Sequence, residues 1–383
     1  LMSKKNFKKI AILLPFKDHF VNSEAGSASI WIKDFNKKSI YKNNISVFGQ
    51  IDDLDADIID KKRYINLNFT PSRFRSKNLS YLDQFIKSFN SNNFSIVEIH
   101  NRPSYLRYLI DKKINSKFVL IFHNNPLTLG GSQTVAERNF LIKHCEKLIF
   151  VSNWVKEKFL LGLDKQDHTK CIVIYPSIEK IKKFPKKKKI ISFVGKLNRS
   201  KGFHLFGSVI VKILNKHKKW KALVIGDEPR EKYNYKHKNL EYKGWISHKK
   251  TLDLYNDTSI SVAPSFWDEP FGRTSMEAGS RGCATIISKK GGLTETNSSA
   301  IYLNELNTKN LFNSIDHLIK NKKILYSVQK RSFDNLLHTL DNNTKKIDHY
   351  RNEILGSNSF FIKKNKKLKI IHISNFGNRL FNR

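Results

Sequence analysis

Residues 259–279 read Ser-Ile-Ser-Val-Ala-Pro-Ser-Phe-Trp-Asp-Glu-Pro-Phe-Gly-Arg-Thr-Ser-Met-Glu-Ala-Gly and decide the fold. The apolar run 259–263 is typical of a buried strand, and a Pro-Phe-Gly turn then separates two carboxylates, Glu269 and Glu277. Thr274 and Glu277 have the spacing of a capping box, in which the threonine caps a helix and the glutamate returns a hydrogen bond. The stretch therefore predicts a strand, a loop and a helix, with Glu269 lacking the capping explanation.

Apolar runs of strand type recur on both sides of this unit. Helical patterns separate them, as in βαβ units of parallel sheets. The earlier strands are expected at 10–14, 96–99, 118–122, 148–151 and 172–174, with a weaker one at 64–67, and the later strands at 190–194, 222–225, 260–263 and 285–287. The earlier helices are expected at 27–35, 81–89, 105–110 and 135–145. The fold class expected is α/β, with two Rossmann-like doubly wound domains facing a cleft.

The domain boundaries follow from where this pattern restarts. A first domain is expected over residues 5–178 and a second over 186–335, with the Lys-rich stretch 180–189 as linker. An amphipathic stretch at 325–354 predicts a helix, whose last part, 336–355, is long enough to cross back to the first domain. Residues 356–383 begin polar and basic, and then contain a strand-like run at 368–373. This tail is interpreted either as the start of a further domain in a longer protein or as an added edge strand or a flexible tail.

Charge is the anomalous part of the composition. The 383 residues include 70 Lys and Arg against 33 Asp and Glu, a formal net charge of +37. Such a balance favours an anionic partner, whether nucleic acid, an acidic membrane surface or an acidic glycan, although a biased coding composition explains the evenly spread lysines equally well. Three widely spaced cysteines predict a reducing, cytoplasmic location and no zinc site. No apolar stretch approaches the length of a membrane span.

Two lysines and two glycines accompany the carboxylates. Lys196 and Lys201 follow the expected strand 190–194 at the start of a helical stretch, where two ammonium groups and a helix N-terminus suit a diphosphate. Gly291 and Gly292 follow the strand 285–287 and are expected to offer free backbone amides to a ligand. Each signal alone is weak, but all four residues lie in the same half of the chain.

In this order, the residues resemble the donor-binding half of family 4 retaining glycosyltransferases, which have the glycosyltransferase B fold. The specific part is Glu-Pro-Phe-Gly-x4-Glu-Ala at 269–278, followed by Gly282 and by Gly-Gly-x2-Glu at 291–295. The resemblance covers most of residues 5–355 and is looser in the first half. It implies a hexosyltransferase-type enzyme that uses a nucleotide-sugar donor and no cofactor.

The resemblance also implies a set of site residues. Glu269 would hold hydroxyls of the donor sugar, Glu277 the ribose, and Lys201 and Lys196 the leaving diphosphate. His123 would lie at the reacting sugar, and His100 and Arg102 on the acceptor side. The other residues implied to contact the donor are Gly26, Gly226, Trp245, Phe271, Gly272, Arg273, Thr274, Gly291 and Gly292. One departure is that family members usually have arginine where Lys196 stands, so the charge is kept but the bidentate fork is lost.

An acidic run at 52–57 contains Asp-x-Asp twice, an arrangement that other glycosyltransferases use to hold a metal ion. It stands far from the donor-site residues in sequence and is interpreted as a solvated loop. We therefore expect no catalytic metal.

The predicted function is transfer of a sugar, with retention of configuration, from a nucleotide sugar to an envelope glycan or glycolipid such as lipopolysaccharide. A basic surface would help the protein dock peripherally at the inner face of an anionic membrane. One alternative is a glycogen-synthase-like or phosphorylase-like enzyme acting on a glucan. Alternatives of another class are a nucleic-acid-binding protein, for which no zinc-finger or RNA-binding signature is present, and a non-catalytic binding protein.

Overall fold

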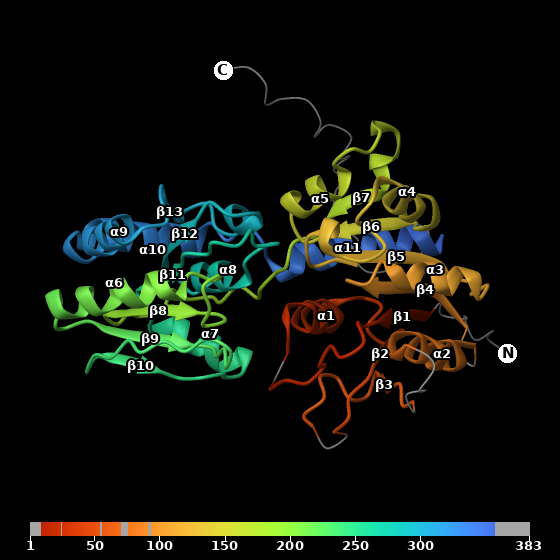
Figure 1. Cartoon of the computed structure of the whole chain (residues 1–383), viewed down its shortest axis with the longest axis horizontal. Coiled ribbons are helices and arrows are strands. Elements are labelled where there is room, and N and C mark those ends of the chain that lie inside the picture. The colour runs from red at the N-terminus through yellow and green to blue at the C-terminus, as the bar shows by residue number, and fades with distance from the viewer. Residues whose placement is uncertain (1–8, 24, 54–55, 70–75, 91–92, 357–383) are drawn as a thin grey trace, which may run out of the picture.

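The structure, a computed structural model, describes residues 9–23, 25–53, 56–69, 76–90 and 93–356 of the chain. Two α/β domains lie side by side (Figure 1), each with a parallel sheet between layers of helices. The predicted fold class is therefore confirmed. In both sheets the strand order reverses beside the first strand of the domain, which is the arrangement that opens a ligand crevice at the carboxyl ends of the strands.

The first domain has a seven-stranded sheet in the order β3-β2-β1-β4-β5-β6-β7. Its central strands are buried on both faces, which explains their continuous apolar runs. Strand β2 was not predicted; its sequence, Ile-Ser-Val-Phe-Gly, is a short apolar run interrupted by a serine. The strands are β1 Lys9–Leu13, β2 Ile45–Gly49, β3 Tyr64–Asn66, β4 Phe94–His100, β5 Lys117–Phe122, β6 Lys147–Phe150 and β7 Cys171–Val173, and the helices are α1 Ser27–Lys38, α2 Lys77–Asn90, α3 Ser104–Asp111, α4 Val135–His144 and α5 Asn153–Leu160, with 3-10 turns η1 Pro126–Thr128 and η2 Lys165–Lys170.

The second domain has a six-stranded sheet in the order β10-β9-β8-β11-β12-β13. The two outer strands, β10 and β13, are short and were not predicted. The strands are β8 Ile190–Val194, β9 Lys221–Ile225, β10 Leu240–Tyr242, β11 Ile260–Ala263, β12 Ala284–Ser288 and β13 Ile301–Leu303, and the helices are α6 Phe203–Lys216, α7 His248–Asp257, α8 Arg273–Ser280, α9 Thr308–Lys320 and α10 Lys322–Asp334, with the 3-10 turn η3 Gly292–Glu295.

The last described helix, α11 Leu340–Leu355, packs on the first domain, where Figure 1 shows it beside β5 and β6. The guanidinium of Arg351 donates to both carboxylate oxygens of Glu98 on β4, at 2.7 and 2.8 Å, and both side chains are almost fully buried. The long helix expected over 325–354 is wrong in one respect, because α10 ends at Asp334. The chain crosses between the domains at residues 335–339, where Ile178 donates to the His338 carbonyl and accepts from the Leu340 amide.

The Lys-rich stretch 180–189 is hydrogen-bonded to the second domain. The Lys187 ammonium donates to the carbonyls of Tyr255 and Asn256, at 2.9 and 3.2 Å, so this segment is held in place rather than trailing through solvent. The predicted strand at 368–373 lies outside the described residues. Within the described ranges, no helix is long and apolar enough to cross a membrane.

Candidate functional site

A cavity of about 620 Å³ opens between the two domains, at the carboxyl ends of their strands. Gly26 and His123, which follow β1 and β5, line it from the first domain. Lys196 and Lys201, which follow β8, line it from the second domain, together with Trp267 and residues 269–274 after β11. This is where doubly wound sheets bind ligands, and both domains contribute walls.

Lys201 and Glu269 form an ion pair in the wall of the second domain. The Lys201 ammonium lies 2.6 and 2.7 Å from the two carboxylate oxygens of Glu269, which is 7% exposed. The same ammonium lies 4.8 Å from the ring centre of Trp267. Gly202, at φ +74, holds the two loops together, since a side chain there would meet the Pro264 carbonyl oxygen at 2.0 Å. The chain thus keeps a fixed cation and carboxylate in contact within the cavity.

Helix α8 begins at this wall. Gly272 stands at its N-cap with φ +95, and the first helical residue is Arg273. The predicted capping box is therefore wrong: Thr274 lies inside the first turn, and no side chain caps the helix. Gly272, Arg273 and Thr274 all line the cavity, so the positive end of the helix opens directly onto it.

Glu277 is buried and paired on one oxygen only. Oε1 accepts from His248 Nε2 at 2.9 Å and from Arg273 Nε at 3.1 Å, whereas no hydrogen bond in the described part of the chain involves Oε2. Burial opposes ionisation, but His248 and Arg273 together hold the pKa of Glu277 below its ordinary value. The carboxylate is therefore charged near neutral pH and has one oxygen left for a ligand.

A second pocket, of about 160 Å³, adjoins the cavity. Gly195, Trp245 and Thr274 line both spaces, so the two lie side by side. Glu277 and Gly226 line only the smaller pocket. Glu269 thus lines the larger space and Glu277 the smaller one beside it.

The opposite wall contains a pair of buried histidines. His123 lines the cavity with an exposed fraction of 7%, and its Nε2 lies 2.9 Å from Nδ1 of His100, which is fully buried. Asn101 fixes the backbone at His123 and Asn124, because its Oδ1 accepts from both of their amides. Burial, and after it the charge of Arg273, lowers the pKa of His123 to about 3. Burial, His123 and Arg351 lower the pKa of His100 as well, so both rings are neutral.

Four predicted positions are corrected by this geometry. His100 cannot contact an acceptor substrate, because it lies behind His123 and has no exposed surface. Arg102 does not line the cavity, and its Nη1 donates to the Asn101 carbonyl. Gly291 and Gly292 serve the loop of Glu269 and not a ligand: the Gly292 amide donates to the Glu269 carbonyl at 2.7 Å, and a side chain at Gly291 would meet that same oxygen at 2.3 Å.

The remaining predicted residues come together. Those that line the cavity, its adjoining pocket or both are Gly26, His123, Lys196, Lys201, Gly226, Trp245, Glu269, Phe271, Gly272, Arg273, Thr274 and Glu277. Sequence reasoning missed Trp267, Asn198, Asn124 and His248, although Trp267 stands inside the opening stretch as an aromatic residue directly before two acids. His248 offered no local signal, because its partner Glu277 is far away in sequence.

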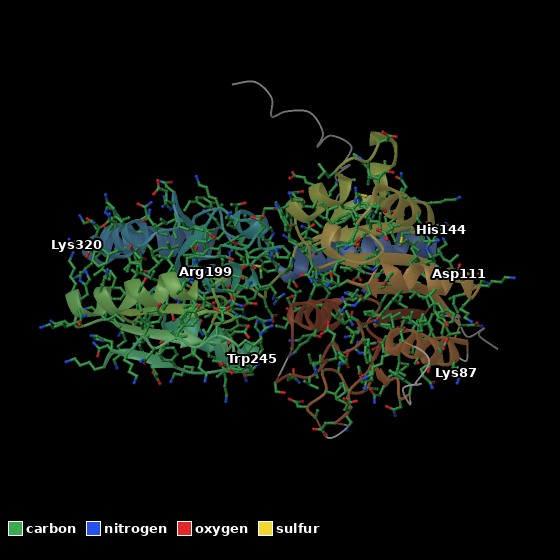
Figure 2. All side chains as sticks on the ribbon, viewed as in Figure 1. Lys87, Asp111, His144, Arg199, Trp245 and Lys320 are labelled. Carbon is green, nitrogen blue, oxygen red and sulfur yellow. The ribbon has the colours of Figure 1, made fainter. Side chains whose placement is uncertain are left out.

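Several contacts join the domains around the cavity. The Trp245 indole Nε1 donates to the Ser23 carbonyl at 2.8 Å, and Figure 2 labels Trp245 at the boundary between the domains. Arg273 Nη2 lies 3.4 Å from Asp34 Oδ2 on α1. Ser152 Oγ donates to the Pro270 carbonyl, and the Glu295 carboxylate accepts from the first two amides of α5. The loop of Glu269 is thus braced by the first domain.

The described part of the acidic run, residues 52–53 and 56–57, does not line the cavity or its adjoining pocket. The Asp57 carbonyl accepts from the amide of Asn22, which does line the smaller pocket, and Asp52 accepts from Gln50. Across the described ranges, no group of three or more His, Cys, Asp or Glu side chains is placed to hold a metal ion.

Residues 175–347 match the model of the family described as glycosyl transferases group 1. Spore coat protein SA of Bacillus subtilis is 22% identical over 318 residues, which cover 74% of this chain and 81% of that protein. The putative glycosyltransferase YtcC of the same organism is 24% identical over 243 residues, covering 55% of this chain and 60% of that protein.

Solved structures share the whole fold. A sucrose-phosphate synthase from Thermosynechococcus elongatus superposes with a TM-score of 0.73 at 14% identity, covering 91% of this chain and 100% of that one. Anabaena Alr3699/HepE, solved in complex with UDP and glucose, gives a TM-score of 0.70 at 14% identity, covering 92% and 100%. The architecture is therefore that of glycosyltransferase B structures.

Proposed function

We propose that the chain is a group 1 glycosyltransferase of hexosyltransferase type, which moves a sugar from a nucleoside-diphosphate donor to an acceptor with retention of configuration; the match of residues 175–347 to the group 1 family model supports this. One observation carries the proposal: the Lys201–Glu269 pair and the start of α8 line the same cavity as His123, and the pocket of Glu277 adjoins this cavity. The chemistry of these two spaces suits the parts of a nucleotide sugar. The complexes of HepE with UDP and UDP-glucose support the donor class.

The donor lies along the site in a definite direction. The nucleoside occupies the smaller pocket, where Oε2 of Glu277 accepts from a ribose hydroxyl and Trp245 and Gly226 flank the base. The diphosphate lies beside Lys196, Gly26 and the N-terminus of α8. The sugar lies between Glu269 and His123.

Catalysis in this proposal rests on positioning and charge. As the bond between the sugar and the diphosphate breaks, negative charge grows on the diphosphate and positive charge on the sugar ring. Lys196, Lys201 and the helix dipole stabilise the negative charge on the diphosphate. Glu269 lies near the positive charge on the sugar ring. These fixed cations favour a reaction without a metal ion or other cofactor, which unchanged turnover in excess chelator would support.

The acceptor is proposed to be an envelope glycan or glycolipid, reached from the cytoplasm at the inner face of the membrane. The net charge of +37 supports this, and Figure 2 shows nitrogen-tipped side chains projecting from both domains. Binding to vesicles that contain anionic lipid, and none to neutral vesicles, is the expected result. Equal binding to both would contradict it, and tight sequestration by RNA would favour the nucleic-acid alternative.

A donor screen tests the central proposal. Purified protein is heated with UDP, GDP, ADP and CMP sugars, and the cognate donor at about 100 times its dissociation constant should add roughly 2.7 kcal/mol to the free energy of unfolding. Release of the nucleoside diphosphate is then measured for wild type and Glu269→Gln. Stabilisation by inorganic phosphate and sugar phosphate alone would point to a phosphorylase instead.

A further inference from the structure

The contact between His100 and His123 limits what His123 can offer a substrate. A single hydrogen bond joins His100 Nδ1 and His123 Nε2, at 2.9 Å, and the two rings stack at an interplanar angle of 19°. Since Nε2 of His123 is used, Nδ1 is the only ring nitrogen that remains for a ligand. A neutral imidazole has one N–H and one bare nitrogen, so the direction of the hydrogen bond decides whether Nδ1 donates or accepts.

The surroundings of His100 decide that direction. Its other ring nitrogen, Nε2, is buried and has no hydrogen-bond partner among the described residues. If His123 donated to His100, that Nε2 would carry a hydrogen with nothing to receive it. Buried N–H groups without an acceptor are rarer than buried acceptors without a donor. The favoured arrangement therefore has the hydrogen on Nδ1 of His100, pointing at His123.

A third aromatic side chain reinforces this choice. Trp31 on α1 packs edge-on against both histidines, with ring centres 5.5 Å from His100 and 5.8 Å from His123. Its indole Nε1–H is also buried and has no partner in the described part of the chain. A hydrogen on Nε2 of His100 would add a second unsatisfied donor to the same cluster. A bare nitrogen there adds no such donor.

We propose that His100 is a positioning residue, which donates to Nε2 of His123 and so fixes the hydrogen of His123 on Nδ1. His123 is then a hydrogen-bond donor to an oxygen of the transferred sugar, and it is not a base. This role rests on the proposed function, because it takes the sugar to lie between His123 and Glu269. The site then holds the sugar between an N–H donor from the first domain and a carboxylate acceptor from the second.

The tautomer is measured directly in the ligand-free protein. Histidines are labelled with ¹⁵N in the ring, and long-range ¹H–¹⁵N spectra separate protonated from bare nitrogens. The resonances of His123 are assigned by their loss in His123→Gln. We expect protonated Nδ1 and bare Nε2 at His123, with the same pattern at His100. A protonated Nε2 at His123 would overturn the inference whether or not the protein turns over any donor.

Two substitutions then connect the tautomer to catalysis. His100→Asn keeps a side-chain N–H near the position of Nδ1, whereas His100→Leu removes the donor and keeps an apolar side chain. We expect His100→Leu to show a mixture of tautomers at His123 and to lose about 10-fold in kcat/KM, the size of one lost hydrogen bond. His100→Asn should recover most of that loss.

Each combination of tautomer and activity results leads to a different conclusion. If His100→Leu shifts the tautomer but keeps wild-type kcat/KM, the positioning role is wrong. If both variants lose activity equally while wild type shows the expected tautomer, His100 acts through packing and the role is again wrong. If wild type turns over no nucleotide sugar, the proposed function fails and with it the substrate contact, while the spectra still decide how the two histidines are protonated.

Discussion

The two walls of the cavity differ in charge: the wall from the second domain carries charged side chains, and the wall from the first domain is neutral. The second domain presents paired charges, Lys201 with Glu269 and Glu277 with His248 and Arg273. The first domain presents neutral groups, the backbone at Gly26 and the His123 ring with His100 behind it. Among the described residues that line the cavity, the charged side chains come from the second domain, while the first domain supplies uncharged groups. In the proposed reaction these charges would respond to the departing diphosphate. The difference suggests that the second domain drives the reaction and the first domain orients it.

The largest expected effect is at the charged wall. Glu269→Gln keeps the shape of the side chain and removes its charge, which leaves Lys201 without its counter-ion and the sugar ring without a nearby carboxylate. We expect kcat for donor turnover to fall about 100- to 1,000-fold. Glu305→Gln, at a residue outside the cavity, is the control and should match wild type. Unchanged turnover in Glu269→Gln would remove the charged wall from the mechanism.

As the pH falls, the free energy of unfolding should decrease first through the buried histidine of the first domain and only later through Glu277 of the second. His123 has a pKa of about 3 when folded and about 6.5 when unfolded, so below pH 6.5 only the unfolded state takes up its proton. The free energy of unfolding should fall by about 2 kcal/mol between pH 6.5 and pH 5 on this account. The lowered pKa of Glu277 acts later, since its stabilisation is lost only as the pH falls below about 4.5.

Urea unfolding at pH 7, 6 and 5 measures this order. His123→Leu should reduce the pH dependence without abolishing it, because it removes one of the two buried histidines that take up a proton on unfolding and leaves His100. His349→Gln, at an exposed histidine, should keep the wild-type slope. A wild-type stability that stays constant down to pH 5 would show that the histidine pair is not held neutral.

A smaller effect is expected at the ion pair between Arg273 of the second domain and Asp34 of the first. Asp34→Asn removes the carboxylate that Arg273 approaches across the domain boundary, while Arg273 keeps its contact with Glu277. We expect the donor dissociation constant to rise about 5-fold, because closing the cleft loses one partly buried ion pair. Calorimetric titration with the cognate donor measures it, and Asp341→Asn on the surface is the matched control. Tighter binding in Asp34→Asn would mean that the pair opposes closure.

The smallest expected effect concerns the Trp245 contact. Trp245→Phe keeps an aromatic ring but loses the hydrogen bond to the Ser23 carbonyl. Because the side chain is 56% exposed, water replaces much of this bond, and we expect donor affinity to weaken about 3-fold. Tyr242→Phe removes a comparable exposed bond within the second domain, to Tyr235, and should leave affinity unchanged. Equal losses in the two variants would show that the bond does not act between domains.

The charged wall was the part that sequence could predict. Glu269, Lys201 and Glu277 follow neighbouring strands of one domain in a recognisable order, so local pattern was enough to group them. The neutral wall depends on packing over long separations: His100 and His123 end different strands, and only the structure shows that one hides behind the other. The capping box failed for a similar reason, because Gly272 at positive φ starts the helix two residues earlier than the threonine pattern indicates.

Helix α11 has a consequence for how the polypeptide is made. Glu98 is 1% exposed and receives its counter-charge from Arg351, 253 residues later in the chain. A ribosome therefore releases the strands of the first domain well before the residue that neutralises their buried carboxylate. A buried charge without a partner is strongly destabilising. The first domain must wait for synthesis of the whole second domain before it can complete its own interior, so the two halves mature together rather than one after the other.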